Sequence, residues 1–240
     1  MKRSQINRII EEAREQFAQA NCHVPEWAFW NPEQWQTIGS EANEIRQHGL
    51  GWIVTDFGSN EFEKYGLVLF VVRNGCLINN KPVSTKTYAE KYMIVRPGQI
   101  TPYHFHWLKT EDLLNRSGGR LKVQLAWAAK NELSISDALV NVQIDGLTKQ
   151  VKAGEEILLQ PGQSVELPPK LCHQFSALPQ DGKVLAGEIS SLNDDTTDNC
   201  FLGRSVNMQA IEEDEPIKYL LNRDHAVLSR NTMLKAAVYN

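Results

Sequence analysis

The chain has 240 residues, a formal net charge of −4 and a hydrophobic fraction of 42%, which is an ordinary globular composition. Its Lys and Arg residues do not cluster with aromatic residues, so a nucleic-acid-binding surface is not expected. The longest apolar run, residues 66–72, is too short to span a bilayer, and the N-terminal segment lacks the apolar region of a signal peptide. We therefore expect a cytoplasmic protein that does not enter a membrane.

The first fifty residues are expected to be helical. Ser4 is placed to cap a helix in which apolar residues recur at helical spacing. These residues are Ile6, Ile9, Ile10, Ala13 and Phe17. Asn31 followed by Pro32 predicts a second helix start, and this helix is expected to continue towards Ile45. The tryptophans of this region, Trp27, Trp30 and Trp35, are interpreted as packing residues.

After residue 51 the sequence consists of short β-rich runs separated by turn residues. The runs span residues 51–58, 66–75, 87–98, 120–128, 139–146, 156–162, 164–169, 173–178 and 183–190. Asp145-Gly146 is typical of a tight hairpin. Many short strands with regular turns predict a β-sandwich or closed barrel, with a jelly roll among the options.

The cysteines are expected to be reduced thiols. The four of them lie far apart and form no C-x-x-C pair, and reduced thiols are usual in a cytosolic protein. They are Cys22, Cys76, Cys172 and Cys200.

Two segments carry histidines in a pattern that favours metal binding. His104 and His106 alternate with Phe105, so on a strand both imidazoles point to the same face. Glu111 follows after a short gap, and a Pro-rich turn precedes His173. Three imidazoles and a carboxylate form a mixed N/O site suited to Mn, Fe, Co, Ni or Zn.

The spacing of the whole set resembles the two motifs of the cupin superfamily. Gly98, five residues, His104-x-His106, four residues, Glu111, six residues and Gly118 match the first motif. Gly162, five residues, Pro168 and then His173 resemble the second. Lys170 stands where a glycine is usual and Ala177 where an asparagine is usual. The resemblance implies a mainly β fold, a cupin jelly-roll β-barrel with a helical N-terminal extension.

We expect three segments: a helical extension over residues 1–50, a β-barrel over 51–215, and a tail over 216–240 that packs on the barrel. Over residues 3–216 the chain also resembles the D-lyxose isomerase family. The resemblance is carried by YAEKYMIVRPGQITPYHFHWLKTEDLLNRSGG, LPPKLCHQF, GEISSLNDDTTDNCFL and IEEDEP.

This second resemblance implies a divalent-metal enzyme, typically dependent on Mn, that interconverts D-lyxose and D-xylulose and often D-mannose and D-fructose. It also implies a homodimer. Isomerising an aldose moves a proton between C2 and C1 through an enediol, for which a metal and a general base are suitable catalysts. Whether the step is a proton transfer or a hydride shift is left open by the sequence.

Lys109 and Glu188 are the candidate catalytic residues. Lys109 lies between His106 and Glu111 in the sequence. Glu188 interrupts an otherwise apolar strand, where an acid is costly unless it faces a cavity or a partner. Lys91 alternates with Glu90 on a predicted strand, so one of the two must face inward. The family resemblance, which extends over this segment, favours Lys91.

Other carboxylates also compete for a role at the site. Asp194 and Asp195 follow the strand that carries Glu188, and we expect them, with Lys91, to bind sugar hydroxyls. Glu212 and Glu213 are interpreted as surface acids, with a lid as the alternative. The residues do not identify which carboxylate is the base.

Three alternatives compete with a free-sugar isomerase. An iron dioxygenase of the same superfamily would use the same ligands, but it would need redox iron and oxygen. A non-catalytic sugar-binding cupin would show no turnover. A phosphosugar isomerase would need a cluster of basic groups for the phosphate, whereas only scattered Lys and Arg are present.

Overall fold

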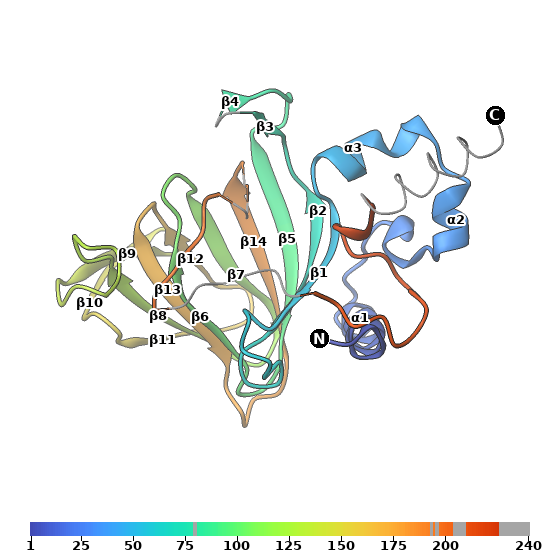
Figure 1. Ribbon diagram of the computed structural model, residues 1–240. Coiled ribbons are helices and arrows are strands. Elements are labelled where there is room, and N and C mark those ends of the chain that lie inside the picture. The colour runs from blue at the N-terminus through green and yellow to red at the C-terminus, as the bar shows by residue number, and fades with distance from the viewer. Residues whose placement is uncertain (79–80, 193, 195–196, 204–209, 226–240) are drawn as a thin grey trace.

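The computed structural model describes residues 1–78, 81–192, 194, 197–203 and 210–225. Its helices are α1 (Arg3–Gln19), α2 (Pro32–Gln36) and α3 (Asn43–Gln47), with the 3₁₀ turns η1 (Glu26–Phe29) and η2 (Ser40–Ala42). The helices gather on one side of the molecule, next to β1 and β2 (Figure 1).

The strands lie in the predicted β-rich region. They are β1 (Gly51–Thr55), β2 (Leu67–Arg73), β3 (Leu77–Ile78), β4 (Lys81–Pro82), β5 (Tyr88–Val95), β6 (Ile100–Phe105), β7 (Glu111–Gly118), β8 (Leu121–Trp127), β9 (Val140–Ile144), β10 (Leu147–Val151), β11 (Glu156–Leu159), β12 (Ser164–Leu167), β13 (Leu171–Ala177), β14 (Val184–Ser191) and β15 (Cys200–Phe201). They include β6 and β7, around the histidine motif, which were not among the predicted runs.

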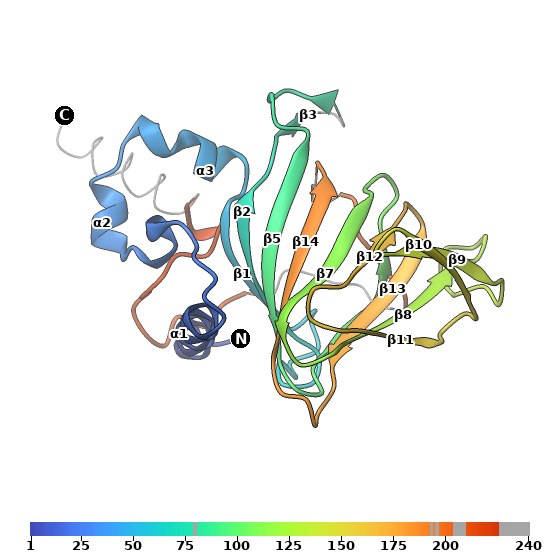
Figure 2. The same cartoon turned by 180° about the vertical axis from the view of Figure 1, so that it is seen from behind.

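Two antiparallel sheets contain most of the described strands. The larger has the order β1-β2-β5-β14-β7-β12-β9-β10, and the smaller β11-β8-β13-β6-β15. The strands of the larger sheet lie side by side in Figure 2. Side chains from both sheets share one hydrophobic core, which includes Leu69, Val95, Leu125, Val165 and Phe175. The mainly β prediction is confirmed, and closure of the sheets into a barrel stays a prediction.

The hairpin between β9 and β10 forms at the predicted dipeptide. Ile144 pairs with Leu147, and Asp145 and Gly146 both have positive φ, at 51° and 77°. Two successive left-handed residues define the turn type that matches the twist of paired strands. The prediction from Asp145-Gly146 is confirmed.

The predicted cap of the first helix is wrong. α1 starts at Arg3 with Lys2 at the N-cap position, and no side chain of the helix caps it. Ser4 lies inside the helix, where its N–H and hydroxyl donate to the Asp214 carboxylate at 2.9 and 2.7 Å. A carboxylate at a helix N-terminus satisfies unpaired N–H groups, so Asp214 replaces a local cap.

The second helix begins where predicted but is shorter than predicted. The side chain of Asn31 accepts the Gln34 N–H, and the Gln34 side chain accepts the Asn31 N–H, which completes a capping box. The helix ends at Gln36, and Gly39 has a non-helical ψ of −131° before η2 begins. The continuous helix towards Ile45 is therefore wrong, because the chain turns at Gly39.

The tryptophans pack within the chain, as predicted. The ring of Trp35 lies edge-on to those of Trp27 and Trp30, with centroids 6.1 and 5.2 Å apart. Trp35 is buried and packs against Ala42 and Leu220. This cluster therefore joins the helical extension to the C-terminal segment.

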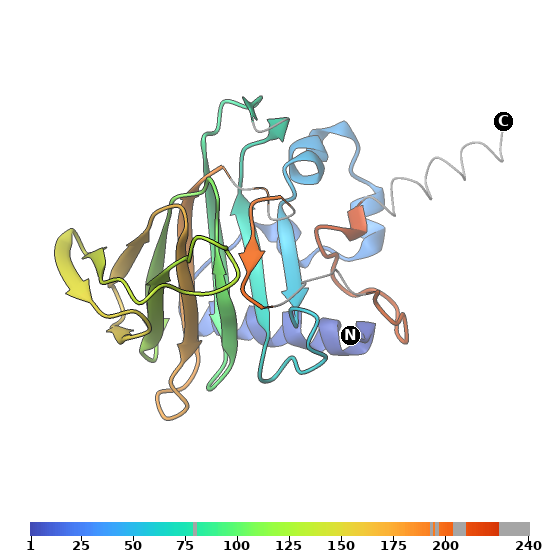
Figure 3. The ribbon, with the colours of Figure 1, turned by 60° about the vertical axis from the view of Figure 1, so that its left-hand side comes forward.

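The C-terminal segment, residues 210–225, returns to the helices and β1 (Figure 3). Leu221 bridges to Trp52 of β1, and the N–H of Asn222 donates to the Trp52 carbonyl at 2.9 Å. α1 packs with this segment in a second core against the outer face of the larger sheet. The division into the three predicted segments stays a prediction, and residues 226–240 of the tail lie outside the described residues.

All four cysteines lie in the described part of the chain and are free, as expected for reduced thiols. Among the described helices, none combines the length and apolarity that crossing a bilayer requires.

Arg3 is the charged residue that joins α1 to the C-terminal segment. Only 1% of its surface is exposed, and its guanidinium donates to the Asp224 carboxylate at 2.9 and 3.2 Å and to Glu213 at 2.7 and 2.8 Å. Arg3→Met is expected to lower the free energy of unfolding by about 3–5 kcal/mol, because it leaves the buried Asp224 carboxylate without a cation.

Urea unfolding of the Arg3 variant measures this loss, and Lys2→Met is the control. Lys2 forms an exposed ion pair with Glu212, and such pairs contribute about 1 kcal/mol or less. Equal stability of the two variants would contradict the assigned role of Arg3.

Candidate metal centre and active site

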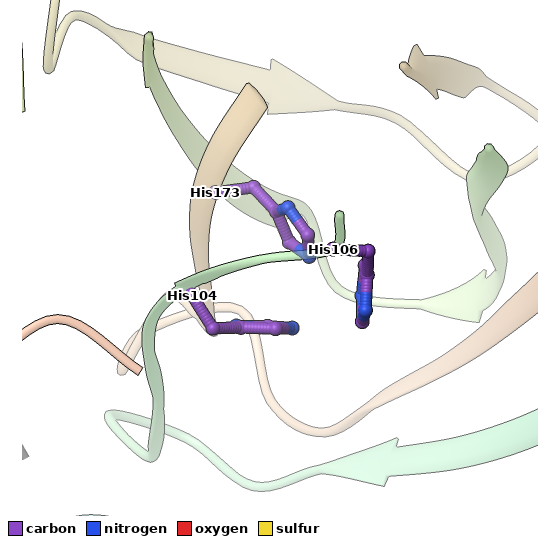
Figure 4. Close-up of side chains that lie close together, drawn as sticks. All are labelled: His104, His106 and His173. Carbon is purple, nitrogen blue, oxygen red and sulfur yellow. The ribbon is translucent and has the colours of Figure 1, made fainter. Parts of the chain in front are cut away.

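Three histidines from the smaller sheet converge on one point (Figure 4). His104 on β6 lies opposite His173 on the neighbouring β13, and His106 follows the end of β6. All three are buried, with at most 8% of their surface exposed. Each histidine has one ring nitrogen that lies within 4.8 Å of a ring nitrogen of each of the other two.

Hydrogen bonds from the opposite side of each ring assign the nitrogen that faces this point. The Nδ1 atoms of His104, His106 and His173 lie 2.9, 2.6 and 3.1 Å from the main-chain oxygens of Pro102, Asp198 and Leu171, respectively. A carbonyl oxygen only accepts, so each Nδ1 carries the proton and each Nε2 keeps a lone pair. This is the arrangement that metal-binding histidines use.

Glu111 supplies a carboxylate to the same point from the larger sheet. It is the first residue of β7, and its Oε1 lies 3.0 Å from His173 Nε2 and 3.7 Å from His106 Nε2. His106 Nε2 is buried and has no hydrogen-bond partner among the described residues. A divalent cation would satisfy this nitrogen, so the donor set fits a metal ion.

A bulge in β6 lets Thr101 share the interior face with His104. Phe175 and His173 are two residues apart on β13 and pair with Thr101 and His104, which are three residues apart on β6. The extra residue on β6 shifts the alternation of side chains by one position, so Thr101 and His104 face the same side of the strand. The sequence pattern gives no sign of this bulge.

Lys170 occupies the glycine position of the second motif in a left-handed conformation. Its φ is 64°, a value that favours glycine. Its N–H donates to the His106 carbonyl at 2.8 Å, and its Nζ lies 3.0 Å from Glu132 Oε1. Lys170 therefore adopts the conformation that favours glycine, and the turn before His173 forms although the residue differs from the usual one.

The electrostatics of the site favour neutral His104 and His106 and an ionised Glu111. Burial lowers the pKa of His104 well below its usual value and that of His106 to about 4, with the Lys109 ammonium adding to the effect at His106. Burial alone would raise the pKa of Glu111, but Lys109 and the histidines hold it well below its usual range. Metal ligation requires these protonation states.

Two lysines hold Glu188 beside the metal ligands. Glu188 Oε1 lies 2.8 Å from Lys109 Nζ and 3.3 Å from Lys91 Nζ, and Lys109 also contacts Glu111 Oε2. Lys91 lies directly opposite Glu188 in the pairing of β5 with β14. Glu188, Lys91 and Lys109 are all buried, so Lys91 faces inward as expected.

These groups line a cavity of about 490 Å³ that extends to the C-terminal segment. Lining residues that the sequence reasoning missed include Thr101, Asn199, Phe201 and Arg223. The Phe201 ring stacks on His104, with centroids 5.0 Å apart and planes at 19°. Thr101, Asn199 and Phe201 lie in segments that carry the family resemblance, but the sequence did not single them out, because they meet only in the fold.

Asp194 takes part in a turn near the site. Its main-chain oxygen accepts the N–H groups of Thr197 and Asp198, and its Oδ2 accepts the Thr197 hydroxyl at 2.9 Å. The cavity lining does not include it, so sugar binding by Asp194 stays a prediction. Asp195 lies outside the described residues.

Glu212 and Glu213 are exposed, as expected of surface acids. Glu213 pairs with Arg3, and Glu212 bridges to Lys2.

Thr101 provides a stability test of the cavity wall. Its Oγ1 is buried and lacks a hydrogen-bond partner among the described residues. Thr101→Val keeps the shape and removes this hydroxyl, so we expect the metal-free protein to gain about 1 kcal/mol in the free energy of unfolding. Thr148→Val at an exposed position of β10 is the control. A loss of stability in urea unfolding would show that the hydroxyl is paired.

Comparison with solved structures shows which fold the chain has. An L-ribose isomerase from Cellulomonas parahominis, solved with L-psicose, has a TM-score of 0.55 at 17% identity, covering 88% of this chain and 98% of that one. An L-ribose isomerase from Acinetobacter sp. DL28, solved with L-ribose, has a TM-score of 0.58 at 16% identity with the same coverage. The fold is thus the mainly β, cupin-like fold of these isomerases.

Sequence comparison then gives the family. The family model described as D-lyxose isomerase matches residues 1–225. A D-lyxose/D-mannose isomerase of Escherichia coli O157:H7 is 45% identical and one of Serratia proteamaculans 40% identical, each covering 94% of this chain and 98% of the relative. The chain belongs to the D-lyxose isomerase family, and it is an aldose–ketose isomerase.

Proposed function

We propose that this enzyme interconverts D-lyxose and D-xylulose, and also D-mannose and D-fructose, in the cavity beside the four candidate ligands. The relatives at 45% and 40% identity carry the name D-lyxose/D-mannose isomerase. The observation that carries the proposal is Glu188, a buried carboxylate held between Lys91 and Lys109 next to Glu111.

His104, His106, Glu111 and His173 would hold the divalent ion. When bound, such an ion polarises the carbonyl and hydroxyl oxygens of the sugar as a Lewis acid. The mixed imidazole and carboxylate donors suit several metals, and the family resemblance favours Mn over Co, Fe, Ni or Zn. The same resemblance supports a homodimer, and the sequence composition supports a cytoplasmic location.

Glu188 is the proposed general base. Its carboxylate removes the proton from C2 of the open-chain aldose, the C1–C2 double bond forms, and the C1 carbonyl π pair moves onto O1, which takes up the proton that O2 gives up. The C2 carbonyl then forms as the same carboxyl group returns the proton to C1. Lys91 and Lys109 hold the Glu188 carboxylate in position through their contacts with its Oε1. Lys109 is also placed to donate a hydrogen bond to the substrate oxygen on which negative charge develops.

A free sugar is favoured over a phosphosugar. Lys91 contacts Glu188, and Lys109 contacts both Glu188 and Glu111, so the positive charge of both lysines is already balanced. Binding a phosphate would require additional cationic groups. Family membership as an isomerase removes the iron dioxygenase and the non-catalytic sugar-binding protein as alternatives.

The test is an assay of the metal-stripped protein after Mn²⁺ is restored. We expect ketose to form from D-lyxose and D-mannose with Mn²⁺ and not after chelation, in the presence or absence of oxygen. Tight Mn²⁺ binding without ketose from either sugar would overturn the proposed substrates. Repeating the reaction in deuterated water checks the proton transfer, which predicts deuterium at C1 of the ketose unless the transferred proton is shielded from solvent.

A further inference from the structure

Asp198 binds the loop between β6 and β7 through its side chain. Its Oδ1 accepts the N–H groups of Trp107 and Leu108 at 2.8 and 2.9 Å, and its Oδ2 accepts that of Lys109 at 2.9 Å. Asp198 is buried, with 6% of its surface exposed. A buried carboxylate with three charge-assisted hydrogen bonds from consecutive N–H groups holds that loop in one conformation.

The main chain of the same residue binds His106. The Asp198 carbonyl accepts the His106 Nδ1–H at 2.6 Å, so one residue contacts all four of the consecutive residues 106–109. The Leu108 side chain is 63% exposed, which means that burial of this side chain contributes little to the conformation of the loop. The hydrogen bonds that Asp198 accepts therefore constrain the centre of the loop, together with the Trp107 contact to Glu132 and the ion pairs of Lys109.

The segment that carries Asp198 is also attached to the histidine strand. β15 follows directly, with Cys200 paired to Phe105 and Phe201 paired to His104. Asn199 and Phe201 line the cavity. Asp198 therefore connects one wall of the cavity to a metal ligand and to a candidate catalytic lysine.

We propose that Asp198 is a positioning residue for His106 and Lys109. Its carbonyl sets the tautomer and orientation of His106, and its carboxylate places Lys109 between Glu111 and Glu188. The part that concerns Lys109 rests on the proposed function, whereas the part that concerns His106 depends only on metal binding. Neither role requires Asp198 to touch substrate.

Asp198→Asn tests the proposal, because an amide offers one acceptor oxygen and turns its NH₂ group towards an N–H donor. The Asp198 carbonyl that accepts from His106 is unchanged in this variant, but weaker hydrogen bonds to residues 107–109 displace the loop that follows His106. We therefore expect the Kd for Mn²⁺ to rise about 10-fold or more, as when the outer-shell support of a metal ligand is disturbed. The free Mn²⁺ signal in electron paramagnetic resonance measures this Kd. At saturating Mn²⁺, kcat should fall by a factor of about ten or more with a smaller change in KM.

Asp145→Asn is the matched control. Asp145 accepts the Ser164 N–H at 2.7 Å in the hairpin between β9 and β10, away from the site (Figure 1). We expect this variant to keep the parent Kd for Mn²⁺ and the parent absorption spectrum with Co²⁺, whereas the Asp198 variant changes both. A folded Asp198→Asn protein with the parent Kd and Co²⁺ spectrum would overturn the inference.

Hydrogen exchange of the unmodified protein provides a second measurement if the Asp198 variant does not fold. The amides of residues 107–109 should exchange far more slowly than those of the exposed Lys130 and Asn131, although Leu108 is exposed. Equal exchange rates would overturn the inference. Failure of the unmodified protein to bind Mn²⁺ would instead overturn the proposed function.

Discussion

His106→Ala is expected to abolish both metal binding and ketose formation. His106 Nε2 is the buried nitrogen without a partner, so its loss removes a ligand that no other described group replaces. Losing the metal removes several kcal/mol of charge stabilisation. A loss of about 4 kcal/mol corresponds to about a 1,000-fold fall in kcat/KM for D-lyxose. Metal content after dialysis and the rate of ketose formation are the two measurements.

His23→Ala is the control for this change. His23 is exposed on the surface and contacts only Asn21, so the variant should keep both the metal and the activity. A His106→Ala protein that retains one bound Mn²⁺ and forms ketose at the parent rate would show that the metal centre lies elsewhere.

Glu188→Gln is expected to lower kcat about 100- to 10,000-fold, the usual contribution of a general base. Glutamine keeps the shape of the side chain but cannot accept the proton from C2. Because Glu188 is not one of the four candidate ligands, the Kd for Mn²⁺ should change little. The split between a large fall in kcat and an intact metal site distinguishes a base from a ligand.

Steady-state kinetics with D-lyxose and Mn²⁺ titration check this prediction, with Glu166→Gln as the control. Glu166 is exposed on β12, so its loss should leave kcat unchanged. A Glu188→Gln enzyme with more than a tenth of the parent kcat would assign the base to another group. The corresponding variant of Lys109, Lys109→Met, would then be the next to measure.

Local sequence signals predicted local structure well. Asn31-Pro32 starts a helix because the Asn side chain accepts an unpaired N–H of the first turn. Proline at the next position has no N–H that would need a partner and has a helical φ. Asp145-Gly146 makes the hairpin because both residues tolerate positive φ. The wrong prediction of the first cap arose where a distant segment intervened. Asp214 replaced the expected Ser4 cap, and it lies 210 residues away in the sequence.

The sequence by itself determined the donor atoms and their order along the chain. The spacing of His104, His106, Glu111 and His173 predicted a metal site, since imidazole and carboxylate are the chemistry that such a site needs. The alternation of side chains on a strand required either Glu90 or Lys91 to face inward, and the family resemblance favoured Lys91.

Only the tertiary structure decided which groups meet at that site. Strand register between β5 and β14 sets Lys91 opposite Glu188, and a bulge in β6 turns Thr101 inward. Asp198 reaches Lys109 across 89 residues of sequence. Such contacts depend on backbone pairing between distant segments, and a one-residue change in register would reverse every side chain. No local pattern encodes that register, so the partners of Glu188 and the contacts of Asp198 emerged only from the fold.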